Sequence, residues 1–431
     1  MSVVRTHELP DACFEGVIPA MLATCAADGT PNFTWLSQVF RVDARHVALS
    51  CQFFRKTRDN LDADPRAQLL VVEPVSVRQY RLDLRFARRE TSGPVFEQMA
   101  RRIQAAASLT STEHVFALQS ADVFEVMMAT EVEVAVGSPA PPPAHAPARD
   151  PLTALARIAE GIADCRGFES LVQSGLAYLT LHLGLDTVSL YLAEPSEQTL
   201  YALASQGYPH SGVGARVAYG VGVIGVVAAR RMPVRIADVA RELRYGRVVR
   251  EQVERATGAS EREVPLPGLE GVSSLLAVPL VVDGELFGVL GTESARRLAY
   301  DERDVQLLQT AGNLLAQALA RSLERAREAS DDEARDAAPT PAPAPDGEVV
   351  KVRYYEADDS VFIDGEYLIK GLPGRILWLL LGLRAREGRD AFLNRELRLH
   401  PLLKLPGYKD NLEARLLMLQ RRLLDKGCPL R

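Results

Sequence analysis

Short apolar runs alternate with turn-forming residues near the start of the chain, a period-two pattern typical of antiparallel strands. Three such runs cover Ile18–Ala26, Phe33–Val42 and His46–Phe54. Asp28 and Gly29 predict a tight two-residue hairpin between the first two runs, because that turn needs positive φ angles. We therefore expect three antiparallel strands closed by short turns.

The pattern changes in the middle of the chain, where two helical stretches, Pro151–Cys165 and Glu169–Gly184, precede a series of short strands. The predicted strands are Thr187–Ala193, Leu200–Gln206, Ala215–Tyr219, Val234–Ile236, Ser274–Val282 and Leu286–Glu293. A long helix is expected from Asp301 to Ala329, and its acidic start suits the positive end of a helix dipole. Asp238–Gly271, rich in Arg and Glu, is either a lid over a pocket or a solvated excursion.

The long helix carries apolar and small residues at steps of three and four, namely Leu308, Ala311, Leu315, Ala318 and Ser322. Such a stripe suits a two-helix seam between subunits. It suits packing on the sheet of its own domain equally well.

The last part of the chain begins with strands at Val350–Tyr355 and Ser360–Lys370, the second interrupted by an Asp364-Gly365 turn. Helices are expected at Pro373–Arg384, Asn394–His400 and Tyr408–Lys426. The final helix has a stripe that should be buried, made of Leu412, Leu416, Leu419 and Leu423. Its basic residues fall on another face, which we expect to be exposed.

Two segments rich in Pro and Ala, 138–147 and 337–345, are expected to be extended linkers. They divide the chain into modules at 1–137, 150–330 and 348–431, joined by linkers at 138–149 and 331–347. A length of 431 residues agrees with two or three domains.

The chain shows neither a secretory signal nor an apolar run of the roughly 18 residues that a membrane span needs, so we expect a cytoplasmic protein without membrane contact. The 5 cysteines lack C-x-x-C spacing and the 7 histidines are dispersed, so neither a disulfide framework nor a metal site is predicted. The sequence has no nucleophile elbow, Walker loop or dinucleotide-binding motif, and no catalytic residue is assigned.

The first 135 residues or so resemble the FMN-binding split barrel of the pyridoxamine 5'-phosphate oxidase family. The residues that carry the resemblance are Ala27–Asn32, Ser37–Val39, His46–Arg66 and a late strand at Ala121–Val126. The resemblance implies seven cofactor contacts: Ser37 and Gln38 near the isoalloxazine ring, Ser50 and Gln52 along the ring or ribityl chain, and Lys56, Thr57 and Arg58 at the phosphate. Charge-assisted bonds to phosphate agree with this assignment. The alternative is that Lys56 and Arg58 are solvated charges at a strand end.

The family's oxidases carry a C-terminal Trp-Gly pair with Arg and His residues that grip the substrate. Here the only tryptophans are Trp35 and Trp378. The resemblance therefore implies a flavin held for sensing or slow redox work, not an active vitamin oxidase. Relatives of this barrel hold haem or deazaflavin, which stay as alternatives to FMN.

The middle module resembles a GAF domain, an α/β sandwich that takes small molecules. Gly220–Gly225, Leu276–Leu280, Phe287–Gly291 and Asp301–Leu319 carry the resemblance. We interpret Gly220–Gly225 as a tight turn of the sheet, with a phosphate loop as the alternative. GAF relatives commonly dimerise through the long helix and split barrels are usually dimers, which implies a homodimer.

Strands followed by three helices resemble the winged helix-turn-helix output domain of bacterial response regulators. The last helix would then read the DNA major groove through Lys409, Asn411, Arg415, Arg421 and Arg422. From Val349 to Arg431 there are 16 Lys and Arg residues against 11 Asp and Glu residues, in a chain with a net charge of −6. Such a local excess of positive charge suits a DNA surface. The alternative is a basic helix that contacts protein. The family's wing follows the recognition helix, and the chain ends at Arg431, so the wing is expected to be incomplete.

Together these patterns predict a multidomain α+β protein with an antiparallel split β-barrel, a GAF sandwich and a winged helix. We expect a one-component transcriptional regulator with the first two modules as inputs and the third as DNA-binding output. One alternative is a flavin-dependent oxidoreductase with a regulatory GAF domain. Another is that the barrel holds no cofactor and serves as a dimerisation scaffold.

Overall fold

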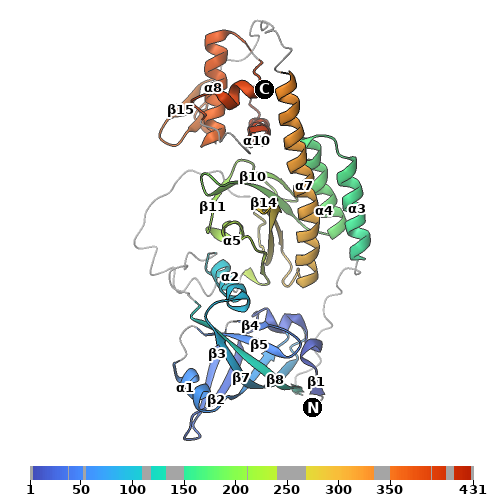
Figure 1. Cartoon of the computed structure of the whole chain (residues 1–431), viewed down its shortest axis with the longest axis vertical. Coiled ribbons are helices and arrows are strands. Elements are labelled where there is room, and N and C mark those ends of the chain that lie inside the picture. Colours follow the sequence, from blue (N-terminus) through green and yellow to red (C-terminus); the bar gives the residue numbers. More distant parts are fainter. Residues whose placement is uncertain are drawn as a thin grey trace.

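The computed structural model describes residues 3–36, 38–51, 55–108, 118–132, 150–210, 212–239, 268–333, 350–389, 391–403 and 412–428. These residues form three antiparallel sheets, each with its own helices. We call the parts the N-terminal domain (3–132), the middle domain (150–333) and the C-terminal domain (350–428). Figure 1 shows them stacked end to end, with the middle domain between the other two.

The N-terminal domain is a curled antiparallel sheet in the order β3-β2-β6-β7-β8-β5-β4, with β1 paired to β8. The strands are β1 (Val3–Val4), β2 (Ala20–Cys25), β3 (Pro31–Leu36), β4 (Val39–Arg41), β5 (His46–Cys51), β6 (Arg66–Val72), β7 (Gln79–Glu90) and β8 (Ser120–Val132). Two helices accompany them, α1 (Arg55–Ala63) and α2 (Pro94–Ser108). Leu69, Val47 and Leu82 are among the fully buried residues at its centre.

The predicted hairpin between β2 and β3 is confirmed, but its loop has three residues instead of two. Ala26 N donates to Thr30 O over 2.9 Å, and Gly29 N donates to Ala26 O. Gly29 alone in this turn has a positive φ, +85°. A three-residue loop needs a positive φ only at its last residue, here Gly29, and Asp28 Oδ1 stabilises the turn by accepting from Thr30 N.

Two further predictions for this domain need correction. The run Phe33–Val42 is broken into β3 and β4. The run predicted from His46 is a strand over His46–Cys51, and its last predicted residues, 52–54, lie outside the described residues. Residues 55–63 form α1, so Lys56, Thr57 and Arg58 lie in the first turn of a helix and not at a strand end. The predicted late strand is confirmed as part of β8.

The middle domain has a six-stranded sheet in the order β11-β10-β9-β14-β13-β12. The strands are β9 (Val188–Glu194), β10 (Thr199–Gln206), β11 (Arg216–Ala218), β12 (Val234–Ile236), β13 (Ser274–Val282) and β14 (Glu285–Ser294), all close to the predicted ranges. Helices α3 (Pro151–Asp164), α4 (Phe168–Leu183) and α7 (Glu302–Glu333) share one apolar core with one face of this sheet. Helix α5 (Gly222–Arg230) packs on the other face.

The glycine-containing segment at 220–225 is a turn only at its start, because α5 begins at Gly222. A Cβ on Gly225 would lie 2.2 Å from the backbone oxygen of Ala218. Glycine therefore lets α5 approach the end of β11 closely. Most of the segment Asp238–Gly271, predicted as a lid or a solvated excursion, lies outside the described residues.

The apolar stripe of α7 packs within its own domain. Leu308, Ala311 and Leu315 are at most 1% exposed and belong to the core shared with α4 and β13. A Cβ on Gly175 of α4 would meet Leu315 Cδ1 at 2.5 Å, so the two helices lie in close contact. The second interpretation of the stripe, packing on the sheet of the same domain, is thus the one observed.

The C-terminal domain has a three-stranded sheet, β15 (Val352–Tyr355), β16 (Ser360–Ile363) and β17 (Glu366–Ile369), and three helices. The helices are α8 (Leu372–Glu387), α9 (Asn394–Leu399) and α10 (Leu412–Asp425). The predicted turn at Asp364-Gly365 is confirmed between β16 and β17. The stripe on α10 is buried at Leu412, Leu419 and Leu423.

None of the helices in these described ranges has both the length and the apolar run that crossing a bilayer requires.

Candidate functional site

A polar cluster holds the start of α1 against β2 and β3. Asn32 Nδ2 donates to Thr57 Oγ1 over 3.1 Å, and Asn60 Nδ2 donates to Thr24 Oγ1 over 3.1 Å. Thr57 and Asn60 are buried, at 6% and 4% exposed. Lys56 is exposed beside them. The first turn of α1 thus presents an exposed cation at a helix N-terminus, an arrangement that attracts anions.

The other side of α1 faces the interior of the sheet. Ser50, Thr57, Arg58 and Asp122 line a cavity of ≈ 10 Å³ together with core side chains such as Phe124. That space holds about one water molecule. Ser50 is only 3% exposed. A cavity of this size does not admit a flavin ring.

Gln38, between β3 and β4, is one of the residues expected near the ring. It is 7% exposed, and its Oε1 is buried without a hydrogen-bond partner in the described part of the chain. An unsatisfied buried acceptor costs free energy, and an N–H group of a bound cofactor would satisfy it. Of the other expected contacts, Ser37 and Gln52 lie outside the described residues.

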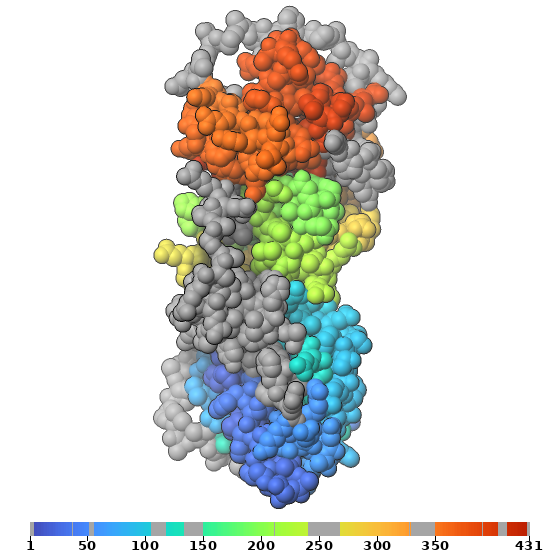
Figure 2. All heavy atoms as spheres, turned by 90° about the vertical axis from the view of Figure 1, so that its left-hand side faces the viewer, coloured from blue at the N-terminus to red at the C-terminus, as the bar shows by residue number. Residues whose placement is uncertain are grey.

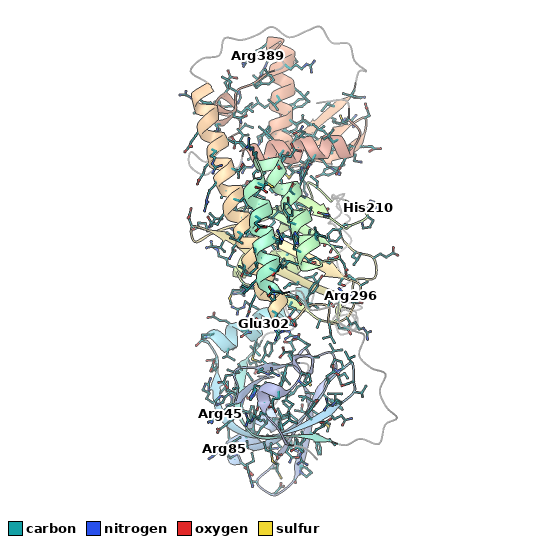
Figure 3. All side chains as sticks on the ribbon, turned by 90° about the vertical axis from the view of Figure 1, so that its right-hand side faces the viewer. Arg45, Arg85, His210, Arg296, Glu302 and Arg389 are labelled. Atoms are coloured by element: carbon teal, nitrogen blue, oxygen red, sulfur yellow. The ribbon has the colours of Figure 1, made fainter. Side chains whose placement is uncertain are left out.

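An open groove of ≈ 740 Å³ crosses the outer face of the N-terminal sheet over β2, β6 and β7. Its lining includes Cys25, Arg66, Gln68, Arg85 and Met127; Figure 3 shows Arg85 on this domain. On the neighbouring strand β3, Phe33 and Trp35 are 63% and 67% exposed. Sequence reasoning did not single out this face, although the alternation of Phe33 and Trp35 with half-buried Asn32 and Thr34 indicates it.

The face of the middle sheet that packs against α5 carries several polar side chains. Ser189, Tyr191 and Glu293 alternate with core residues on β9 and β14, and Tyr208 lies near Ser189. Burial raises the pKa of Glu293, and a hydrogen bond that its carboxylate accepts from Leu269 N at 2.8 Å lowers that pKa in part. Sequence reasoning missed this group, because strand alternation does not tell which face binds a ligand.

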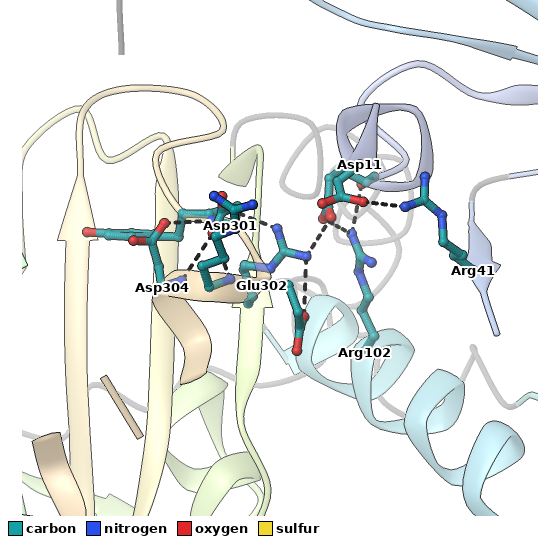
Figure 4. A network of polar contacts seen from close by, with 10 residues as sticks. Asp11, Arg41, Arg102, Asp301, Glu302 and Asp304 are labelled. Carbon is teal, nitrogen blue, oxygen red and sulfur yellow. Dashed lines mark hydrogen bonds and ion pairs between the residues drawn. The ribbon is translucent and has the colours of Figure 1, made fainter. Parts of the chain in front are cut away.

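Buried ion pairs join the N-terminal and middle domains (Figure 4). The Glu15 carboxylate contacts Arg102 of α2 at 2.5 Å and Arg235 of β12 at 2.6 Å. Its side chain is only 5% exposed. Arg235 also donates to Tyr300 O over 2.9 Å, just before α7. The first sheet is thereby connected to the start of the long helix.

The opposite end of the middle domain carries α10. Arg415 pairs with Glu194 at the end of β9, and the two side chains are 5% and 7% exposed. Arg422 Nε donates to Leu368 O over 2.9 Å, and Arg421 Nη1 lies 3.4 Å from Leu203 O. Ala414 packs with Leu192 and Leu323.

The expectation of an exposed basic face on α10 is therefore wrong for Arg415. The middle domain covers that side of the helix, and the C-terminal core covers the side that bears Leu412. Lys409 and Asn411, the other residues expected to read DNA, lie outside the described residues. Figure 2 shows the C-terminal domain (orange to red) directly above the middle domain (green to yellow).

Two family models match the chain. Residues 9–132 match pyridoxamine 5'-phosphate oxidase, and residues 168–319 match the GAF domain. The N-terminal domain is pyridoxamine 5'-phosphate oxidase-like, and the middle domain is a GAF domain. The matched residues take in the cluster at α1 and the polar face of the GAF sheet. No match to a winged-helix family accompanies them, and no curated protein matches the chain.

Solved structures resemble the two domains separately. The GAF domain of an Acinetobacter phosphoenolpyruvate-protein phosphotransferase is 22% identical, covers 40% of this chain and 93% of its own, and has a TM-score of 0.32. Free methionine-R-sulfoxide reductase from Neisseria meningitidis is 24% identical over 42% of this chain and 91% of its own, with a TM-score of 0.31. An FMN-binding protein from Syntrophomonas wolfei is 16% identical over 30% of this chain and 85% of its own, with a TM-score of 0.25.

Proposed function

We propose that this protein is a sensor and transcriptional regulator, in which the oxidase-like domain holds FMN, the GAF domain takes a second small molecule, and the C-terminal domain binds DNA. The observation that carries the proposal is that the GAF domain is joined to both neighbours by buried ion pairs. Glu15 with Arg235 lies at one end and Glu194 with Arg415 at the other. A conformational change in the oxidase-like domain or in the GAF domain can therefore reach α10 through these buried ion pairs.

The residues beside α1 fit the flavin in part. Lys56 and the N-terminal turn of α1 would hold its phosphate, and the unsatisfied Gln38 Oε1 would accept a hydrogen bond from its ring. When bound, the flavin would supply reversible redox chemistry. In this proposal Ser37 and Gln52 complete the site, while Ser50, Thr57 and Arg58 support it from the interior.

The C-terminal helices would supply the DNA contacts. The excess of Lys and Arg over Asp and Glu in this region attracts phosphate. Because Arg415 is buried against Glu194, the proposal requires α10 to leave the GAF domain before it enters a groove. The arrangement described here is then the state with low DNA affinity.

We further propose a homodimer, formed over the outer face of the oxidase-like sheet. Phe33 and Trp35 project from the edge strand β3 beside the ≈ 740 Å³ groove. Aromatic residues are enriched at protein–protein interfaces, and two exposed ones on the same strand beside a groove suit such a contact. A dimer also suits DNA binding to paired half-sites.

The first experiment is an absorption spectrum of the purified full chain, followed by identification of any chromophore released on denaturation. Flavin bands and released FMN are expected. Lys56→Ala should lower the flavin content, whereas Arg45→Ala, on an exposed loop of the same domain, should not. A Soret band would replace FMN by haem in the proposal, and a colourless protein that takes up no added FMN would eliminate the flavin input.

The DNA output is tested separately, by fluorescence anisotropy with duplexes selected from a random pool at several salt concentrations. Affinity should fall steeply with salt and change with the redox state of the flavin. Absence of salt-dependent binding in every redox state would exclude the regulator. Size measurement by light scattering, with Trp35→Ser as the variant, tests the dimer.

A second candidate is a flavin-dependent oxidoreductase under GAF control, favoured by the match of residues 9–132 to an oxidase family. Steady turnover of a reduced nicotinamide or of a pyridoxamine substrate by the purified chain would support it over the regulator.

A further inference from the structure

Two of the three guanidinium nitrogens of Arg421, on the side of α10 that faces the GAF domain, have no acceptor in the described part of the chain. Its Nε and Nη2 are both buried with no hydrogen-bond partner, and Nη1 reaches only Leu203 O at 3.4 Å. Within the described part of the chain, no other arginine has two such nitrogens. Burial lowers the pKa of Arg421, and the carboxylates of Glu169 and Asp425 raise it in part. A charged group buried without acceptors is costly, so the site favours an anion.

A cleft of ≈ 390 Å³ lies beside this guanidinium, and both domains line it. Helix α10 contributes Arg421, Leu424 and Asp425, and the GAF domain contributes residues of α4 and β10 together with Val213. The volume is in the range of small-molecule sites, roughly 300–1,000 Å³. Leu424 is 63% exposed at its edge, so the cleft is open to solvent.

The lining distinguishes among anions. The guanidinium fork matches either a carboxylate or a phosphate. Asp425 gives the lining a second, opposite charge, which disfavours a dianion such as phosphate. Leu424, 63% exposed, supplies apolar surface for a hydrocarbon tail at the edge of the cleft, and the buried residues Leu176, Ala204 and Val213 form an apolar floor.

We propose that this interdomain cleft binds a small aliphatic monocarboxylate, with Arg421 holding the carboxylate and the apolar residues holding the tail. Such a ligand contacts the GAF domain and α10 at once. It therefore stabilises the docked arrangement of the two domains by mass action. This site lies apart from the flavin residues and from the polar face of the GAF sheet, and its existence does not depend on flavin or DNA binding.

The test is isothermal titration of the full chain with sodium hexanoate, compared with 1-hexanol, which lacks the charge, and with inorganic phosphate, which lacks the tail. Saturable binding is expected for hexanoate and not for 1-hexanol, with phosphate weaker. Arg421→Gln should bind hexanoate roughly ten- to hundredfold more weakly, from the loss of charged hydrogen bonds. Arg422→Gln is the matched control, because Arg422 is the next residue and donates to Leu368 O outside the cleft.

Asp425→Asn should bind hexanoate and phosphate more tightly than the natural chain, because it removes the negative charge from the lining. Far-UV circular dichroism and the Tm establish that Arg421→Gln is folded. Equal hexanoate affinity in Arg421→Gln would overturn the proposal, as would equal binding of 1-hexanol. Phosphate binding as tight as hexanoate would overturn the monocarboxylate assignment, and an unchanged affinity in Asp425→Asn would overturn the charge argument.

Discussion

The buried pair between Glu194 and Arg415 should behave differently when one partner is replaced than when both are. Burial lowers the pKa of Arg415 to about 10, still far above neutral, so the side chain stays charged. Glu194→Met would leave this cation 5% exposed with no counter-charge. Such a loss costs about 3–5 kcal/mol. The bond from Ser196 Oγ to Glu194 Oε1 is lost as well.

Replacement of both residues should restore most of the stability. In Glu194→Met with Arg415→Met neither charge is buried, and side chains of similar length fill the space. Apolar replacements of buried ion pairs are commonly neutral or stabilising by about 1–4 kcal/mol. We therefore expect the double variant to lie within about 1 kcal/mol of the natural chain, far from the sum of the single changes.

The assay is urea unfolding followed by the fluorescence of Trp378. Trp378 belongs to α8 and stacks on Tyr354 with ring centroids 5.1 Å apart, so its emission reports the C-terminal domain. Trp35 is replaced by Phe in every variant, which leaves one reporter. Glu285→Met is the control, because its partner Arg231 is exposed and such surface pairs contribute about 0–1 kcal/mol.

Two results would refute this reasoning. One is a single change, Glu194→Met, that costs no more than Glu285→Met. The other is a double variant whose loss equals the sum of the two single losses, since that would mean the charges do not depend on one another.

Four more predictions concern other sites in the three domains. Glu15→Ala should leave Arg102 without its carboxylate partner and Arg235 with Glu302 at 4.0 Å, at a cost of at most about 3–5 kcal/mol, and hydrogen exchange should rise in α2 and β12; unchanged exchange there would contradict the role of Glu15 at the junction. Glu293→Gln should raise the Tm at neutral pH. Because burial raises the pKa of the Glu293 carboxyl, ionisation of that carboxyl destabilises the folded state at neutral pH. The increase in Tm should therefore vanish at pH values below the ordinary pKa of Glu, where the carboxyl is protonated in both the folded and the unfolded state. An increase in Tm that does not depend on pH would contradict this explanation. Gly225→Ala should destabilise the GAF domain by about 1–3 kcal/mol or more, since its Cβ would lie 2.2 Å from Ala218 O. Gly382→Ala in α8 meets nothing closer than 4.0 Å and should gain about 0.5–1 kcal/mol, as measured by thermal unfolding.

The local pattern of apolar and polar residues was sufficient to predict some of the helices and strands. Strands β12 and β13 occupy the predicted ranges, because apolar runs bounded by polar or turn residues have only one way to be buried. Helix α1 was not predicted, since its polar residues give little periodicity and it is held by side-chain bonds to β2 and β3. Helix α2 and strands β6 and β7 were also left unassigned. For β7, the alternation of Tyr80, Leu82 and Leu84 with charged residues does indicate a strand.

The candidate cofactor residues came from a resemblance, and the structure adds where they lie. Lys56 is at the surface, whereas Ser50 and Thr57 face the interior. The two-residue period of a strand does not tell which of these side chains are exposed, because Ser50 lies in a strand and Lys56 and Thr57 lie in a helix.

The sequence by itself determined the order of the modules, the amphipathic helices and the residue types available for binding anions. Only the tertiary structure decided which of those residues are accessible. Helical periodicity identifies the face of α10 that packs on its own domain, but the partner of Arg415 is 221 positions away in another domain. Burial of Arg415 and the unpartnered N–H donors of Arg421 depend on how two domains meet, and that contact has no local pattern in the sequence.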